Sequence, residues 1–121
     1  MISRSTKRLR GEARIQAEFC DWMRANAPEV MFMSIPNEHS TDAERVKLAA
    51  MGLRKGAADV MMLLRDNVPE WIEFKTPRKK QTPAQVEFQA EVESRGMRYH
   101  LCFSASEAVM IVLELIQKGE L

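Results

Sequence analysis

Apolar residues recur at helical spacing in four segments of this chain. The clearest case is 12–26, where Ile15, Phe19, Trp22 and Met23 share one face of the predicted helix. Capping boxes open two later helices, because a Ser or Thr placed three residues before Gln or Glu satisfies backbone amides that the first turn leaves free. The predicted helices span 12–26, 42–51, about 83–95, and the stretch from Ser104 to near Gly119.

Four further segments have the pattern of β-strands. Residues 60–64 form an unbroken apolar run, which favours a strand buried on both faces, whereas residues 70–75 alternate between apolar and polar. Turn-forming residues between these two runs predict a β-hairpin over 59–75. The predicted strands span 30–36, 60–64, 70–75 and 97–103.

The order of these elements is α-β-α-β-β-α-β-α, which predicts an α/β fold with a central mixed β-sheet flanked by helices on both faces. No repeat, low-complexity run or Gly/Ser/Pro-rich linker divides the sequence, so we expect a single domain over residues 1–121. A chain of 121 residues buries about two-thirds of the surface that its unfolded form exposes, which is enough for a core without disulfides.

Charge is balanced over the whole chain but uneven along it. The chain carries 18 Lys and Arg against 17 Asp and Glu, and its net charge of +1 excludes nucleic-acid binding by bulk positive charge. The N-terminus is nevertheless basic and admits two interpretations, a DNA-contacting arm or a solvated helix start. Its basic residues are Arg4, Lys7, Arg8, Arg10 and Arg14, against the single acid Glu12.

The sequence has no feature of a membrane or secreted protein. No segment approaches the roughly 18 consecutive apolar residues of a membrane helix, and the N-terminus lacks the apolar core of a signal peptide. The two isolated cysteines, Cys20 and Cys102, are interpreted as buried thiols in a reducing compartment. We therefore expect a cytoplasmic protein with no membrane partner.

The candidate chemistry gathers at one end of the predicted hairpin. Asp59 falls opposite residues 73–75, where Glu73 and Lys75 project to the same face of their strand. Charged side chains on otherwise apolar strands are costly unless they are paired or bind a metal. Two neighbouring carboxylates suit a hard divalent cation, and a lysine beside them can orient or deprotonate water. A cross-strand salt bridge made by Lys75 explains the same residues equally well.

Three neighbouring features favour a site over a salt bridge. Gly56 lets the backbone come close just before the hairpin. The basic loop 78–80 directly follows Lys75, where a phosphate backbone could run. Gln85 lies on the sheet-facing side of its helix and needs a polar partner, and the carboxylates are the nearest one. The candidate phosphate contacts are Arg78, Lys79 and Lys80, with Arg54 and Lys55 before the hairpin.

Spaced motifs along the chain form a larger pattern. They are Glu12 with Ile15 and Gln16, Pro36-Asn37, Gly56-Ala57-Ala58-Asp59, Ile72-Glu73-Phe74-Lys75, Gln85 with Phe88, and Gly96-Met97-Arg98-Tyr99. Together these motifs resemble the VRR-NUC domain, the virus-type replication-repair nuclease branch of the PD-(D/E)XK superfamily. The resemblance runs from about Glu12 to Ser104. Ala58 departs from the proline in the superfamily's name, at a position that shapes the turn and donates no ligand.

The resemblance implies a restriction-endonuclease-like core and a metal-dependent endodeoxyribonuclease that uses Mg²⁺ or Mn²⁺ to hydrolyse DNA phosphodiester bonds. It implies metal binding by Glu12, Asp59, Glu73 and the backbone carbonyl of Phe74. It further implies that Asp59, Glu73, Lys75 and Gln85 form the catalytic set, in which Lys75 serves the attacking water.

The resemblance also suggests partners. A free-standing domain of this kind looks like a phage or prophage form and is similar to dimeric Holliday-junction resolvases. The expected partners are therefore branched DNA and a second copy of the chain, acting in replication or repair in a bacterial or phage-infected cell. Two other classes stay open. One is a catalytically silent nuclease-like module that binds DNA or protein, and the other is a protein-interaction module in phage assembly that would bind no metal.

Overall fold

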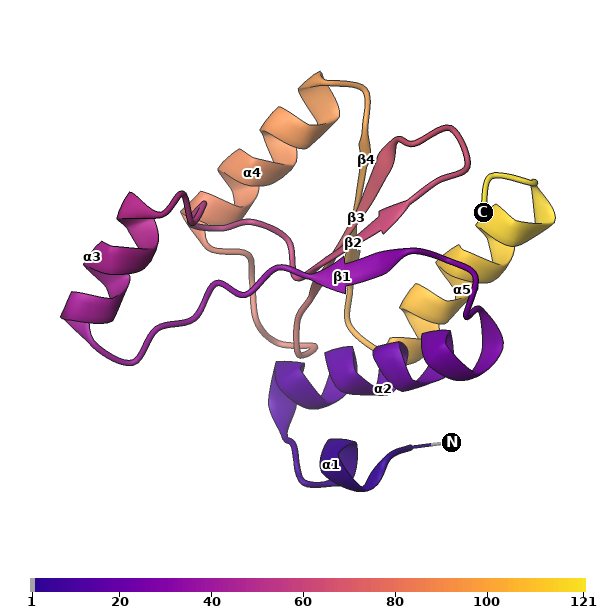
Figure 1. The fold of residues 1–121 in the computed structure, drawn as a ribbon, viewed down its shortest axis with the longest axis horizontal. Coiled ribbons are helices and arrows are strands. Elements are labelled where there is room, and N and C mark those ends of the chain that lie inside the picture. The colour runs from indigo at the N-terminus through magenta and orange to yellow at the C-terminus, as the bar shows by residue number, and fades with distance from the viewer. Residues whose placement is uncertain (1) are drawn as a thin grey trace.

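The computed structural model describes residues 2–121 and places five helices and four strands among them (Figure 1). The fold is α/β, as the sequence predicts. In chain order the elements are α1 (Arg4–Lys7), α2 (Gly11–Asn26), β1 (Phe32–Ser34), α3 (Asp42–Ala50), β2 (Val60–Leu63), β3 (Pro69–Phe74), α4 (Pro83–Ser94), β4 (Arg98–Cys102) and α5 (Ala105–Gln117).

The four strands form one mixed sheet in the order β1-β2-β3-β4. β1, β2 and β3 pair antiparallel, whereas β3 and β4 pair parallel. The hairpin of β2 and β3 is the predicted one, and Val60 pairs with Ile72 at its open end. Asp59, one residue earlier, therefore lies level with Glu73, one residue later, as the hairpin pattern predicts.

Helices cover both faces of this sheet. Phe19 and Met23 of α2 pack with Ile72 and Phe74 of β3 in the larger core, to which α5 contributes Val112. On the opposite face, a smaller cluster joins α4 to the sheet through residues such as Phe88. Figure 1 shows this arrangement, with α4 on one side of the strands and α2 and α5 on the other. Alternate residues of β3 thus enter different layers, and Glu73 belongs to the α4 side.

The N-terminal segment differs from the prediction, because residues 4–7 form the short helix α1. The Ser3 hydroxyl oxygen accepts a hydrogen bond from the Thr6 amide and caps this turn. Four residues are too few to show a hydrophobic period, so the pattern could not reveal them. The backbone amide of Ser3 also donates to Asp21 of α2 at 2.8 Å, and Thr6 is buried. The basic N-terminus is therefore folded against α2 rather than free.

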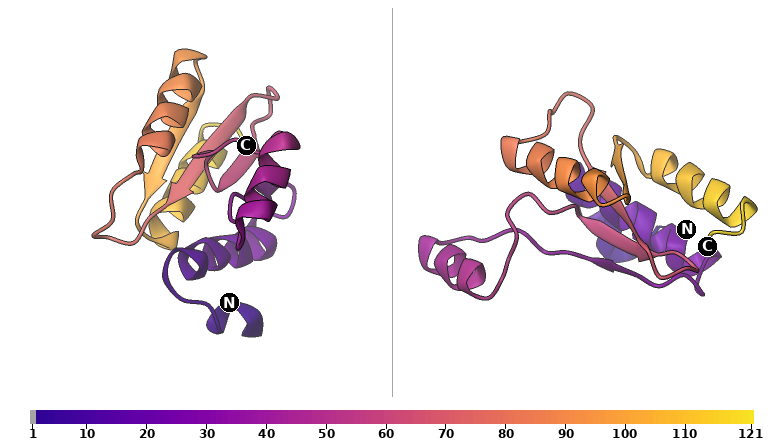
Figure 2. Two further views of the ribbon diagram at one scale, coloured as in Figure 1. Left: turned by 90° about the vertical axis from the view of Figure 1, so that its left-hand side faces the viewer. Right: turned by 90° about the horizontal axis from the view of Figure 1, so that it is seen from above.

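α3 packs less against the rest of the fold than the other long helices do. Its first turn is capped by Thr41, but of its nine residues only Leu48 is even half-buried. Figures 1 and 2 show this helix standing away from the sheet, joined to it by extended segments on either side. Among residues 2–121, no helix combines the length and the apolar character needed to cross a membrane.

Candidate active site

Asp59 is held at the open end of the hairpin by a backbone hydrogen bond. The Phe74 amide donates to Oδ2 of Asp59 at 2.8 Å. Phe74 lies beyond the last ladder pair of β2 and β3, so its amide has no carbonyl partner on β2 and the carboxylate takes that place. The strand end therefore fixes the position of the first predicted site residue.

Glu73 is the second carboxylate, and it is only 2% exposed. Its Oε2 accepts a hydrogen bond at 3.0 Å from Nε2 of Gln85. The Oε1 of Gln85 in turn accepts from the Thr82 amide at 2.9 Å, which completes the capping box at the start of α4. Gln85 therefore joins the helix cap to the carboxylate, and the expected contact between Gln85 and the site is present.

The two carboxylates are electrostatically coupled. Burial, together with the neighbouring Asp59, raises the pKa of Glu73 to about 9, while Lys75 acts in the opposite direction. Burial also raises the pKa of Asp59, although the hydrogen bond from Phe74 opposes the shift. At neutral pH the metal-free pair therefore retains a proton that a bound cation would displace.

Lys75 and Glu12 complete the charged set. Lys75 is 6% exposed, and its charge lowers the pKa values of both Asp59 and Glu73. Glu12, in the first turn of α2, raises the pKa of the same two groups and lines a cleft together with them. Nζ of Lys79 lies 3.9 Å from Oε2 of Glu12, so the basic loop reaches the edge of the site.

The donor set fits a divalent cation. Oε1 of Glu73 and Oε2 of Glu12 are buried and accept no hydrogen bond from any described residue. Buried carboxylate oxygens without donors are costly, and hard cations such as Mg²⁺ and Mn²⁺ prefer such oxygens. Within residues 2–121, however, no three His, Cys, Asp or Glu side chains are grouped closely enough to form a ready metal centre. The carboxylates are thus neighbours around a cleft of about 480 Å³ rather than a closed cage.

The predicted DNA-binding residues divide into two groups. Arg78 and Lys80 are exposed and form no ion pair with a described residue, and Lys55 lines the cleft. Arg54, by contrast, pairs with Glu91 of α4 at 3.0 Å and lies over the Phe88 ring. Its charge is therefore partly neutralised, and it ties the turn before β2 to α4.

The structure explains why position 56 is a glycine, which the sequence indicated only in part. Its φ of +83° lies in the left-handed region, and a Cβ there would stand 2.4 Å from the backbone of Ala84. The close approach is therefore to the first turn of α4, the turn that carries Gln85. The turn before β2 therefore packs directly against the start of α4.

From the sequence we assigned no role at the site to two groups of residues beside it. Asn37, His39 and Arg45 line the cleft from the loop after β1 and from α3, a location that only the path of the chain in space reveals. Nε2 of Gln81 donates to Oε1 of Gln89 at 2.9 Å and to Oη of Tyr99 at 3.2 Å. These bonds fasten the basic loop to α4 and β4. The available signal was a pair of amide side chains eight positions apart, Gln81 just before α4 and Gln89 in its second turn.

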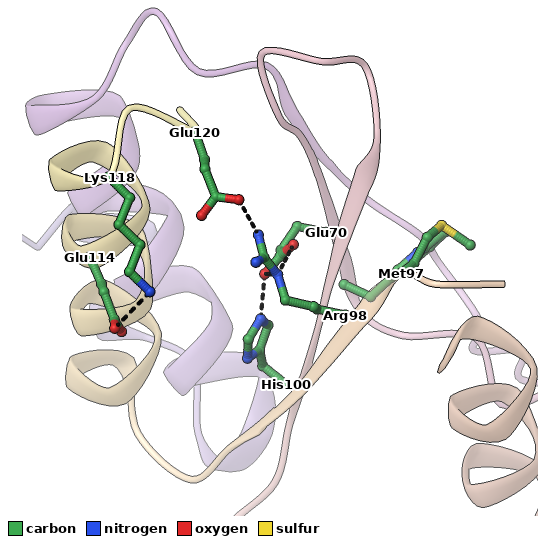
Figure 3. Close-up of polar contacts among 8 residues, drawn as sticks. Glu70, Met97, Arg98, His100, Glu114, Lys118 and Glu120 are labelled. Atoms are coloured by element: carbon green, nitrogen blue, oxygen red, sulfur yellow. Dashed lines mark hydrogen bonds and ion pairs between the residues drawn. The ribbon is translucent and has the colours of Figure 1, made fainter. Parts of the chain in front are cut away.

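A second buried carboxylate lies at the other end of β3 and is fully paired (Figure 3). Both oxygens of Glu70 accept from Nε of Arg98 at 3.0 Å, and Oε2 also contacts Nε2 of His100. Arg98 extends to Glu120 at 3.1 Å, which ties the C-terminal segment to the sheet. His100 contacts this carboxylate rather than the candidate active site.

The mixed sheet brings Asp59 and Glu73-Phe74-Lys75 together across the end of one hairpin, as the resemblance to the PD-(D/E)XK nuclease class led us to expect. The comparisons with known proteins agree with that class. The family model of the VRR-NUC domain matches residues 2–106, and the chain belongs to this family. It is thus a nuclease-type DNA-processing domain.

Solved structures show the same fold. One, titled "VRR_NUC domain protein", has a TM-score of 0.68 and 19% sequence identity, and the match covers 93% of this chain and 94% of the other. Another, titled "VRR_NUC domain", has a TM-score of 0.55 and 22% identity over 88% of this chain and 94% of the other. No curated protein matches the sequence.

Proposed function

We propose that this domain is a divalent-metal-dependent endodeoxyribonuclease that hydrolyses DNA phosphodiester bonds. The observation that carries the proposal is the state of Glu73, a buried carboxylate beside Asp59 and the buried Lys75. One of its oxygens accepts no hydrogen bond from any described residue. A structural carboxylate in the same sheet, Glu70, has both oxygens paired. An unpaired oxygen beside a second acid favours a site that another group completes.

Each residue has a role that follows from its position. Asp59, Glu73 and Glu12 would hold Mg²⁺ or Mn²⁺, with the Phe74 carbonyl as a further ligand, and the bound cation would supply Lewis-acid stabilisation of the phosphate. Lys75 orients the attacking water and accepts or shares its proton. Gln85 holds the Glu73 carboxylate in place.

The basic loop would bind the DNA backbone. Arg78, Lys79 and Lys80 follow Lys75 directly, and Lys79 already reaches Glu12 at 3.9 Å. Phosphates bound there would pass close to the carboxylates. We assign a supporting contact to Lys55, which lines the cleft, and a smaller one to Arg54, because Glu91 holds its guanidinium.

The substrate we propose is branched DNA, such as a four-way junction, acted on by a homodimer of twice 13.9 kDa during replication or repair. A four-way junction has two-fold symmetry, and a two-fold dimer would present two sites to matching strands. Exposed Met31 and Met33 near β1, and Leu113 and Ile116 on α5, offer apolar surface for the interface. Val112 of the same helix is buried in the core and is not part of that surface.

Labelled linear, flap, splayed and four-way DNAs incubated with Mg²⁺, Mn²⁺ or EDTA test the proposal. We expect cleavage with either cation, none in EDTA, and preference for the four-way junction. Light scattering at micromolar protein should give the dimer mass. Cleavage in EDTA, or an Asp59→Ala variant as active as wild type, would contradict the site. A monomer that cuts linear duplex as readily as junctions would contradict the substrate and the dimer.

The second candidate is a silent DNA- or protein-binding module. It is supported by the lack, over residues 2–121, of three His, Cys, Asp or Glu side chains grouped closely enough to hold a metal ion. It predicts DNA binding without Mn²⁺ binding. Calorimetry with Mn²⁺ separates the two candidates.

A further inference from the structure

α3 is kept helical by hydrogen bonds at its own ends. The Thr41 hydroxyl oxygen accepts from the Glu44 amide at 3.0 Å, and the Glu44 carboxylate accepts from the Ser40 amide at 3.2 Å. At the other end, the Leu53 amide donates to the Leu48 carbonyl at 2.9 Å, in the pattern of a Schellman turn. Isolated helices this short are marginal in water, so these end contacts support a helix that the core does not.

One face of α3 borders the candidate active site. No residue of the helix belongs to either hydrophobic cluster formed by the described residues. Arg45 and Ala49, four positions apart and therefore on the same face, line the cleft that also holds Asp59 and Glu73. Lys55, beyond the end of the helix, lines this cleft too. The helix is therefore placed to act on what the cleft binds.

α3 and the basic loop 78–80 approach the carboxylates from different directions. Both views in Figure 2 show α3 and the loop between β3 and α4 on opposite sides of the strands. The loop reaches the site at Glu12, whose Oε2 lies 3.9 Å from Nζ of Lys79, whereas α3 reaches it at Arg45. A DNA strand that passes the carboxylates would therefore meet the loop on one side of the scissile phosphate and α3 on the other.

The cations that line the cleft are available to a ligand. Among the described residues, Arg45 pairs only with Asp42 of its own helix, at 3.8 Å, and the two side chains are 54% and 98% exposed. Exposed pairs of this kind contribute little, so the guanidinium can exchange Asp42 for another anion. Lys55 forms no ion pair with a described residue.

Four acids line the same cleft. Glu12, Asp59 and Glu73 are the proposed ligands of the divalent cation, which would offset their charge, and Glu38 is exposed to solvent. With the cation bound, the basic side chains from α3 and the turn after it complement the charge of a phosphodiester backbone.

We propose that the cleft-facing side of α3, with Arg45 and the neighbouring Lys55, binds backbone phosphates of the DNA strand that is cut. The inference rests on the proposed nuclease function and adds a contact on the side of the scissile phosphate away from the basic loop. It requires backbone phosphates only, so it applies to the paired arms of a four-way junction. Arg45 holds the DNA beside the carboxylates and takes no part in the chemistry.

Binding measurements in EDTA compare two basic residues of the same helix. Arg45 lines the cleft and Lys47 does not, and both are exposed. Arg45→Ala should weaken binding of a fluorescein-labelled four-way DNA roughly five- to tenfold, and its slope of log affinity against log salt should fall by about 0.9, as for one lost phosphate contact. Lys47→Ala, the matched control, should change the affinity by less than about twofold. Equal changes of affinity and slope in the two variants would overturn the site.

A pair of added charges tests the same face of the helix. Ala49 lines the cleft and Ala50 does not, and both are exposed. Ala49→Glu places a carboxylate where the phosphates would lie and should lower the affinity for four-way DNA at least as much as Arg45→Ala. Ala50→Glu changes the net charge equally and should lower it far less. Glu is a strong helix former, so neither variant should disturb α3. Wild-type affinity in Ala49→Glu, or equal losses in the pair, would contradict the site.

These outcomes are separable from those of the proposed function. Cleavage by the Glu73→Gln variant at the wild-type rate would defeat the nuclease assignment and leave the binding result for α3 intact. Metal-dependent cleavage by wild type, together with equal DNA affinities of Arg45→Ala and Lys47→Ala, would defeat the α3 site alone.

Discussion

Two glutamates three residues apart on β3 are almost equally buried and have opposite surroundings. Glu70 is 1% exposed, and Arg98 and His100 pair its carboxylate. Glu73 is 2% exposed, has one oxygen without a partner among the described residues, and lies beside a second acid. Because their numbers differ by three, the two side chains point to opposite faces of the sheet.

This is the difference expected between a structural carboxylate and one that binds a metal. Each buried charge must be compensated, and the chain compensates Glu70 with its own cations. Among the described residues, Gln85 and Lys75 accompany Glu73, but one of its oxygens has no hydrogen-bond partner. That end of the strand is therefore destabilised in a way that a bound divalent cation would relieve.

The largest expected difference concerns cleavage. Glu73→Gln keeps the shape of the side chain but removes a metal ligand, so the rate should fall roughly a thousandfold or more, as expected for several kcal/mol of lost stabilisation. Glu70→Gln should keep the wild-type rate per folded molecule. Single-turnover assays on four-way DNA in Mg²⁺ compare the two. Equal losses of cleavage rate in both variants would contradict the distinction between Glu70 and Glu73.

The next largest effect is on the stability of the fold, and here the variant that should lose more is Glu70→Gln rather than Glu73→Gln. Glu70→Gln leaves Arg98 and His100 without their carboxylate and should lower the free energy of unfolding by about 1–3 kcal/mol. The partial exposure of Arg98, 46%, keeps the loss in this range rather than above it. Urea unfolding followed by tryptophan fluorescence gives the value. An unchanged midpoint would show that the Glu70 cluster contributes nothing net.

The stability of the metal-free protein should depend on pH through Glu73. Its pKa is raised from 4.5 to about 9, so the folded chain holds this proton more tightly than the unfolded chain. The stabilisation is therefore present below about pH 4.5 and is lost as the pH rises toward 9. Glu73→Gln, which cannot ionise, should be more stable than wild type by about 1–2 kcal/mol at pH 8 in EDTA. Thermal melts from pH 5 to 9 test this, and parallel curves would contradict it.

The smallest effect concerns the support of Glu73 by α4. Gln85→Met removes the hydrogen bond to Glu73 and half of the capping box, and should lower the cleavage rate about tenfold or less, equivalent to about 1 kcal/mol of positioning. Thr82→Ala weakens the same helix start without touching Glu73 and should leave the rate of the folded protein unchanged. A rate loss shared by both would trace the effect to the helix rather than to the contact.

The sequence predicted the features that depend on local pattern. The hairpin over 59–75, the Thr82 capping box and the helical face of Phe19 all follow from spacing within a few residues, and the structure confirms them. The juxtaposition of Asp59 with Glu73 followed from the same hairpin register. The contact of Gln85 with Glu73 could be predicted because a polar residue on a buried helix face needs a partner.

Features that depend on the path of the chain could not be predicted. The pairing of Glu70 with Arg98 needs the parallel register of β3 and β4, which no turn between them specifies. The fold of residues 2–10 against α2 is set by Ser3 and Thr6, whose small polar side chains carry no periodic signal. The clash that makes Gly56 necessary involves Ala84, a residue 28 positions away.

Calorimetric titration of Mn²⁺ into wild type, Glu70→Gln and Glu73→Gln at pH 7.5 tests the central claim most directly. Two buffers of different ionisation enthalpy measure the protons released. The account predicts that wild type and Glu70→Gln bind Mn²⁺ and release about one proton, because the cation displaces the proton held by Asp59 and Glu73. It predicts greatly weakened binding by Glu73→Gln. Equal Mn²⁺ affinity in all three proteins, or no binding by any of them, would contradict the assignment of Glu73 as a metal ligand.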